Sequence, residues 1–102
     1  MISQELKKIA NFYGYEAQSS QLIEECAELI QAINKYRRAT SGRGLPLPDY
    51  KSAVTFENLI EEIADVEIML GQIKYLLSIP EEDLEAIKLF KINRTKERIR
   101  GA

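Results

Sequence analysis

The sequence predicts an all-α protein, and three observations lead to that prediction. Apolar residues recur three and four positions apart, as on one face of a helix, over most of the 102 residues. No stretch alternates apolar and polar residues over the length of a strand. Helix-interrupting residues concentrate in one place, because residues 40–54 hold two of the five glycines and two of the three prolines. We expect a single domain over residues 1–102, folded as a four-helix-type bundle.

Two similar stretches dominate the sequence: LIEECAEL at residues 22–29 and LIEEIADV at residues 59–66, which agree at five positions. On a helix, residues three positions apart lie on the same face. Each stretch therefore presents one pair of acidic side chains on one face, at the flank of its apolar stripe. The pairs are Glu25 with Glu28, and Glu62 with Asp65.

These acid pairs predict a metal site. If the two apolar stripes pack antiparallel, four carboxylates converge at the edge of one core, where they repel one another unless cations lie between them. Hard oxygen ligands suit Mg²⁺, with Mn²⁺ as a substitute. The chain has no histidine, which disfavours ferritin-like di-iron sites and catalytic zinc. One acid pair alone is common on a solvated helix face, but two pairs in the same position of two stretches favour the metal.

The first half of the chain predicts two helices. The first is expected at residues 2–12, with Ser3 as its N-cap and Gly14 as its stop. The second runs over residues 16–38 without proline or glycine and ends in basic residues, as the helix dipole favours. Residues 40–54 form a long connection to the second half.

The second half of the chain predicts two more helices. Thr55 is the expected N-cap of the third helix, which runs to about residue 77. Ser78 can cap the fourth helix, at residues 80–99, with Pro80 in its first turn. The acidic start and basic end of that helix complement its dipole.

Basic side chains are available for an anionic ligand. The long connection is expected to bring Arg43 and Lys51 between the two helices that carry the acid pairs, where an anion held by a metal would need cationic partners. A flexible surface loop without such a role is the alternative.

Composition narrows the class of partner. The net charge is −2, so no basic surplus argues for nucleic-acid binding. No apolar run has the length of a membrane span and no signal-peptide pattern appears, so we expect no membrane partner and a cytoplasmic location. The lone cysteine, Cys26, lies in an apolar stripe and is expected in the core.

The chain is expected to form a homodimer or a dimer of dimers. A chain of 102 residues builds only a modest core. Four isoleucines fall away from the centre of the predicted stripes and would need a second subunit to cover them. They are Ile23, Ile30, Ile60 and Ile68.

The acidic motifs resemble those of a known family. EECAE at residues 24–28 and EIAD at residues 62–65 are similar to the EExxE and ExxD signature of MazG-like all-α nucleoside triphosphate pyrophosphohydrolases. The resemblance implies helical dimers that cleave the α–β phosphoanhydride of a nucleoside triphosphate, releasing a monophosphate and pyrophosphate. It also implies that Glu25, Glu28, Glu62 and Asp65 bind Mg²⁺.

The resemblance extends to substrate contacts. The run from Lys91 through Asn93 to Arg94 is similar to the family's C-terminal segment, which contacts phosphates. The interval between the two motifs is longer than is usual in the family. The chain also lacks the tryptophan that some relatives place against the base, so the resemblance leaves the base open.

The expected chemistry is hydrolysis of a polyanion. Clustered Mg²⁺ would neutralise phosphate oxygens and activate water, and Glu24 or Glu61 is expected to act as an outer-shell group or as the base for water. The alternative is a helical oligomerisation module without enzymatic activity, in which the acids pair with arginine and lysine of a neighbouring subunit.

Overall fold

The computed structural model describes residues 2–102 and confirms the all-α prediction. It contains three helices: α1 (Gln4–Thr40), α2 (Tyr50–Leu76) and α3 (Glu81–Arg100). No strand occurs within residues 2–102. In the same residues, no helix combines the length and the apolar character that a membrane crossing requires.

Helix α1 is interrupted at Gly14, where the backbone leaves the helical region with φ 85° and ψ 170°. This region of the backbone map is essentially restricted to glycine. The residues before Gly14 therefore form a short segment of their own, capped by Ser3, whose hydroxyl accepts a hydrogen bond from the Leu6 amide at 3.3 Å. The predicted first helix, its cap and its stop are confirmed.

The predicted start of α2 at Thr55 is wrong. Asp49 is the N-cap, and its carboxylate accepts a hydrogen bond from the Ser52 amide at 2.7 Å. The Ser52 hydroxyl in turn accepts one from the Leu47 amide at 2.7 Å. Thr55 lies inside the helix, with its hydroxyl donating to the Lys51 carbonyl at 2.8 Å. An aspartate at the cap is a better acceptor for free helix amides than an interior threonine, so the helix begins nearer to the prolines than predicted.

The predicted cap of the last helix is also wrong. Pro80 occupies the N-cap position of α3, without a side-chain hydrogen bond. Ser78 instead adopts a left-handed conformation, with φ 52°, which turns the chain away from α2. Three acidic residues in the first turn of α3 complement its dipole.

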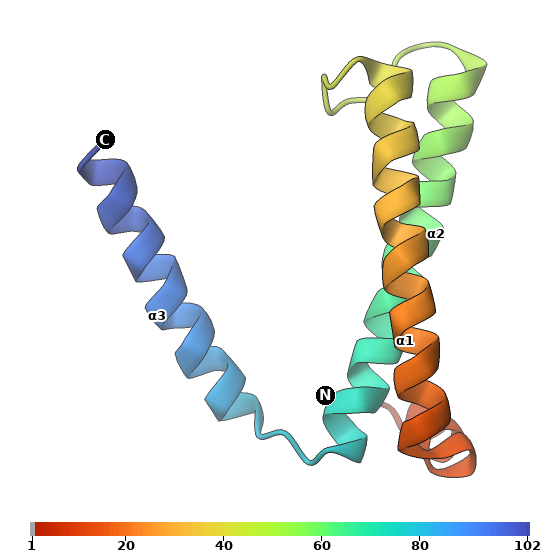
Figure 1. Ribbon diagram of the computed structural model, residues 1–102, viewed down its shortest axis with the longest axis vertical. Helices are drawn as coiled ribbons and strands as arrows, with labels where there is room; N and C mark the ends of the chain where they lie inside the picture. The colour runs from red at the N-terminus through yellow and green to blue at the C-terminus, as the bar shows by residue number, and fades with distance from the viewer. Residues whose placement is uncertain (1) are drawn as a thin grey trace.

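Helices α1 and α2 pack as an antiparallel hairpin, and α3 projects away from it (Figure 1). An ion pair between Lys74 and Glu81, at 3.3 Å, joins the end of α2 to the start of α3. Beyond that contact, α3 packs against neither helix in the described chain. Within residues 2–102 the chain therefore forms a two-helix hairpin and a separate third helix, and not a closed four-helix-type bundle.

The core of the hairpin is small and partly polar. Its buried apolar residues are Ala10, Ala32, Tyr36, Val66 and Met69. Four polar residues are buried with them: Gln18, Thr40, Ser52 and Gln72. The Gln18 amide donates a hydrogen bond to the Gln72 side-chain oxygen at 2.7 Å, which satisfies both groups across the interface.

Much of the apolar surface is left open. Ile23, Ile30, Ile60 and Ile68 are 72%, 61%, 51% and 43% exposed, in keeping with the prediction that one chain does not cover them. Cys26, predicted in the core, is exposed. It lies on a part of the apolar stripe that α2 does not cover, because α1 meets α2 through the neighbouring face.

Candidate metal centre

The acid pairs of α1 and α2 meet where the two helices pack, with Glu28 exposed and the other three acids half-buried. One carboxylate oxygen from each of Glu25, Glu28 and Glu62 lies within 4.8 Å of the other two. Asp65 faces Glu25 and contributes to its shifted pKa. We call these four residues the acidic cluster. The structure thus brings together all four residues that the sequence predicts as metal ligands.

The cluster lies in the contact face rather than at the edge of the core. On α1, Gln18, Glu25 and Ala32 follow one another at intervals of two helical turns, and the two neighbours of Glu25 in this row are buried. On α2, Glu62 is one turn from the buried Val66. The predicted position at the flank of the apolar stripe is therefore wrong, because the helices meet through the face that carries the acids.

Burial and mutual repulsion raise the pKa values of two acids in the cluster. Burial is the largest effect on Glu25 and raises its pKa from the ordinary 4.5 to about 7, with further increases from Glu28, Glu62 and Asp65. Burial likewise raises the pKa of Glu62, reinforced by Glu28, Asp65 and Glu61. Near neutral pH, a cluster without cations therefore retains protons that a divalent cation would displace.

One oxygen of the cluster has no partner. Oε2 of Glu62 is buried and forms no hydrogen bond within residues 2–102. An unsatisfied buried acceptor is costly, and a cation would satisfy it. Half-buried carboxylates with hard oxygen donors fit Mg²⁺ or Mn²⁺. The donor set therefore fits the predicted metal.

The two candidate bases border the cluster. Glu24 and Glu61 are exposed, each preceding a cluster residue in its helix. Glu61 is close enough to raise the pKa of Glu62. Either carboxylate has access to water, as a group that accepts a proton from water must.

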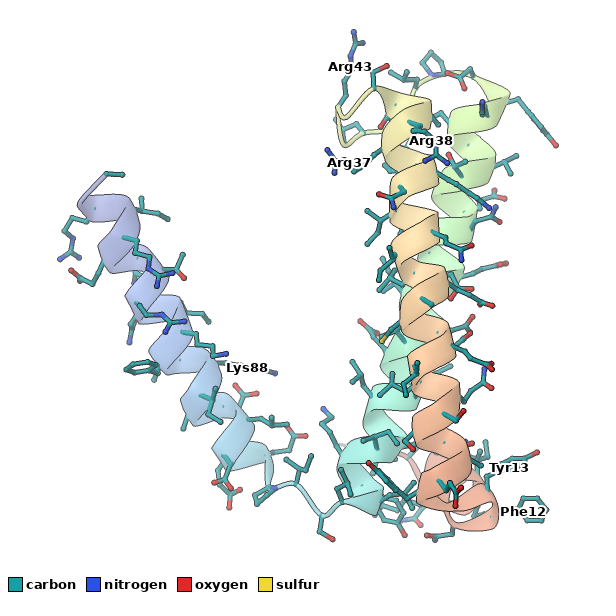
Figure 2. The ribbon with its side chains drawn as sticks, in the orientation of Figure 1. Phe12, Tyr13, Arg37, Arg38, Arg43 and Lys88 are labelled. Atoms are coloured by element: carbon teal, nitrogen blue, oxygen red, sulfur yellow. The ribbon has the colours of Figure 1, made fainter. Side chains whose placement is uncertain are left out.

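The structure does not bring Arg43 and Lys51 to the cluster. Both are exposed at the loop end of the hairpin, where Figure 2 labels Arg43. From Lys51 to Glu62, at 1.5 Å per residue, α2 advances by roughly 16 Å. The loop is also held in place, because the Tyr36 hydroxyl donates a hydrogen bond to the Gly44 carbonyl at 3.0 Å.

The predicted phosphate contacts of the last helix are likewise separate from the cluster. Lys91, Asn93 and Arg94 are exposed on α3, which stands apart from the hairpin (Figure 1). The Arg94 guanidinium lies over the Phe90 ring, 5.8 Å from its centroid. Within one chain, α3 supplies no cation to the acids.

The structure also contains two cavities that the sequence did not predict. The larger, of about 710 Å³, lies where the N-terminal segment folds over the end of α2, and Lys7, Lys74 and Tyr75 are among its lining residues. The smaller, at the end of α1, contains Arg37 and Arg38. The only sequence signal for the second was the pair of adjacent arginines, which the helix dipole already explained.

No family model matches this chain, and no curated protein or solved structure shows significant similarity to it. The function proposed below therefore rests on the acidic cluster and its motifs.

Proposed function

We propose that this chain is a Mg²⁺-dependent nucleoside triphosphate pyrophosphohydrolase. It would add water across the α–β phosphoanhydride of an NTP or dNTP, giving a nucleoside monophosphate and pyrophosphate. Such an activity removes nucleotides from the cellular pool, for which the cytoplasm is the expected compartment.

One observation carries the proposal: the unpartnered Glu62 Oε2 lies in a group of three carboxylates whose oxygens approach within 4.8 Å. Without a cation such an arrangement is unfavourable, since like charges and an unsatisfied acceptor are held together. Two similar stretches, residues 22–29 and 59–66, supply these carboxylates. Their acidic motifs resemble the MazG-like signature. We assign Mg²⁺ binding to Glu25, Glu28, Glu62 and Asp65, with Mn²⁺ as a substitute.

The chain's own residues would then complete the chemistry. Bound Mg²⁺ would supply charge neutralisation and water activation. Glu24 or Glu61 would accept the proton of the attacking water. Lys91, Asn93 and Arg94 would bind the phosphates of the leaving group.

We infer that the four-helix-type bundle is completed by a second chain. The exposed apolar residues of α1 and α2 support this, because a second hairpin packed on them would cover Ile23, Ile30 and Ile60. A homodimer is the simplest such assembly, and a dimer of dimers also satisfies it. Since α3 does not reach the cluster of its own chain, phosphate contacts from α3 would come from a partner chain or after α3 has moved.

The test is a product assay. Purified protein is incubated with a panel of NTPs and dNTPs in millimolar Mg²⁺, and nucleoside monophosphate and pyrophosphate are measured separately. We expect equimolar amounts of both products, with no turnover in EDTA. The Glu62→Gln variant should lose nearly all activity, whereas Glu57→Gln, which changes an exposed acid of the same helix, should retain it. Orthophosphate without pyrophosphate, or no product from any nucleotide, would contradict the proposal.

A second candidate function is a helical oligomerisation module without enzymatic activity. The large exposed apolar residues on all three helices favour it. As an ion-pair surface toward a partner, the acids would show little dependence on divalent cations. The two functions therefore differ in the effect of Mg²⁺ on melting: an increase in Tm supports the metal site, and an unchanged Tm supports the module.

A further inference from the structure

A solvent-open hollow, lined by exposed residues that carry unpaired donors, lies at the C-terminal end of α1. It has a volume of about 320 Å³ and is lined by Asn34, Arg37, Arg38, Ser41 and Gly42. We call it the arginine cavity. Figure 2 shows Arg37, Arg38 and the nearby Arg43 together at the loop end of the hairpin, opposite the end that carries Phe12 and Tyr13.

The polar side chains of the arginine cavity have no partners in the described chain. The ion pairs of residues 2–102 join Lys74 to Glu81, Lys88 to Glu85 and Arg100 to Glu97, so none involves these arginines. No side-chain hydrogen bond of the same residues involves the Asn34 amide, either guanidinium or the Ser41 hydroxyl. Their hydrogen-bonding groups are therefore available to a ligand.

The end of the helix does not itself need these arginines. The Gly42 amide donates to the Arg37 carbonyl at 2.9 Å, and the Ser41 amide donates to the Arg38 carbonyl at 3.4 Å. Main-chain donors thus satisfy the carbonyls that basic side chains can otherwise cap. Positive charge at this end still complements the helix dipole, but that effect requires neither a cavity nor an adjacent amide and hydroxyl.

The arginine cavity is independent of the acidic cluster. At about 100° of rotation per residue, Asn34 lies on the face of α1 opposite Glu25, and it is roughly 14 Å further along the helix. The carboxylates of the cluster therefore neither neutralise the arginines nor share a ligand with them inside one chain.

We propose that the arginine cavity binds small phosphate-bearing anions, with inorganic pyrophosphate as the representative ligand. Two guanidinium groups offer paired N–H donors that match phosphate oxygens. Asn34 and Ser41 also line the hollow, and their amide and hydroxyl supply two uncharged donors. The volume is at the lower end of the range for small-molecule sites, which suits an anion of one or two phosphates.

The experiment titrates pyrophosphate, and separately orthophosphate, into the full chain in EDTA at about 0.15 M salt, where exposed charges are screened beyond about 8 Å. The Nε–Hε signals of arginine are followed by NMR. We expect saturable shifts of two arginine signals, and at least 10-fold weaker pyrophosphate binding when Arg37→Gln and Arg38→Gln are combined. The matched control combines Lys96→Gln and Arg98→Gln, which removes the same charge from exposed positions of α3 and should change the affinity less than 3-fold.

Two further variants separate a built site from general attraction. Asn34→Ala leaves the net charge unchanged, and we expect about 3-fold weaker binding because one donor is lost. Glu62→Gln alters only the acidic cluster and should leave binding intact. The proposal is overturned by the absence of saturable binding, by equal losses in the two double variants, or by loss of binding in Glu62→Gln. Thermal melting of each variant checks that the fold is retained.

Discussion

Gln18 and Gln72 are joined by a buried 2.7 Å hydrogen bond across the α1–α2 interface, and this pair marks the register of the hairpin. Two helical turns beyond it along α1 is Glu25, and two turns back along α2 is Asp65. In an antiparallel pair these two acids are opposite each other, and Glu28 is opposite Glu62 by the same pairing. The glutamine pair therefore has the register that brings the acid pairs together.

We predict that Gln18→Ala destabilises the protein by about 1–3 kcal/mol, because the buried Gln72 side chain loses a partner. Thermal or urea denaturation measures the change. Gln21→Ala, at an exposed position of the same helix, is the matched control and should change the free energy of unfolding by less than about 0.5 kcal/mol. Equal effects of the two variants would show that the Gln18–Gln72 hydrogen bond does not stabilise the register of the hairpin.

Stability without metal should decrease as the pH rises. The pKa of Glu25 is about 7 in the folded protein and ordinarily 4.5, so between these values the folded state holds more protons than the unfolded state. The free energy of unfolding then falls with rising pH over that interval, and the raised pKa of Glu62 acts in the same direction. In EDTA we expect Tm to be roughly 5 °C higher at pH 5 than at pH 7.5.

The Glu25→Gln variant is the control for this pH dependence, since it removes the titrating group. Its melting temperature should vary less between pH 5 and pH 7.5 than that of the wild type. A wild-type protein that becomes more stable from pH 5 to pH 7.5, with the same slope in Glu25→Gln, would contradict the prediction.

Charge removal in the cluster should also stabilise the metal-free protein at pH 7.5. Glu25→Gln keeps the size of the side chain and relieves repulsion, so we expect Tm in EDTA to rise by roughly 2–4 °C; Asp65→Asn should raise Tm or leave it unchanged. We expect Mg²⁺ to raise the Tm of the wild type, and both variants should lose that increase. If the acids were instead buried ion-pair partners, each change would cost about 3–5 kcal/mol, so a marked decrease in both variants would exclude the metal cluster.

The break in α1 should depend on glycine. An added Cβ at Gly14 meets no atom within 4 Å, yet its φ of 85° is unfavourable for any side chain. We therefore expect Gly14→Ala to destabilise by about 1–3 kcal/mol. Gly71→Ala is the matched control: its site inside α2 is also open, and alanine there should stabilise by about 1 kcal/mol. Opposite signs in denaturation experiments are the expected result, and stabilisation in both would show that α1 is continuous.

The molecular mass in solution should be two or four times the 11.7 kDa of one chain. Light scattering coupled to size exclusion at micromolar concentration measures it, and we expect a dimer or tetramer because the exposed isoleucines need a second surface. Ile30→Glu should shift the protein toward the monomer, whereas Glu16→Gln, at an exposed polar position, should not. A monomeric wild type would contradict the proposed assembly.

The sequence by itself determined those features that depend on neighbours within a turn or two. Helical periodicity made the chain all-α, and three-residue spacing put each acid pair on one helix face. Gly14 and Ser3 acted locally, through a backbone conformation and a single cap hydrogen bond. The start of α2 was predicted at Thr55, but the N-cap is Asp49. This too is a local effect, since either side chain can accept a hydrogen bond from a helix amide.

Only the tertiary structure decided which faces of the helices meet. The repeats predicted contact through their apolar stripes, but α1 and α2 pack through the neighbouring face, where the Gln18–Gln72 hydrogen bond lies. That choice placed Glu25, Glu62 and Asp65 half-buried between the helices, and it left Cys26 and several isoleucines exposed. Helical spacing specifies a face of each helix separately, whereas the register between two helices depends on contacts between residues far apart in the chain, such as the buried pairing of two amides.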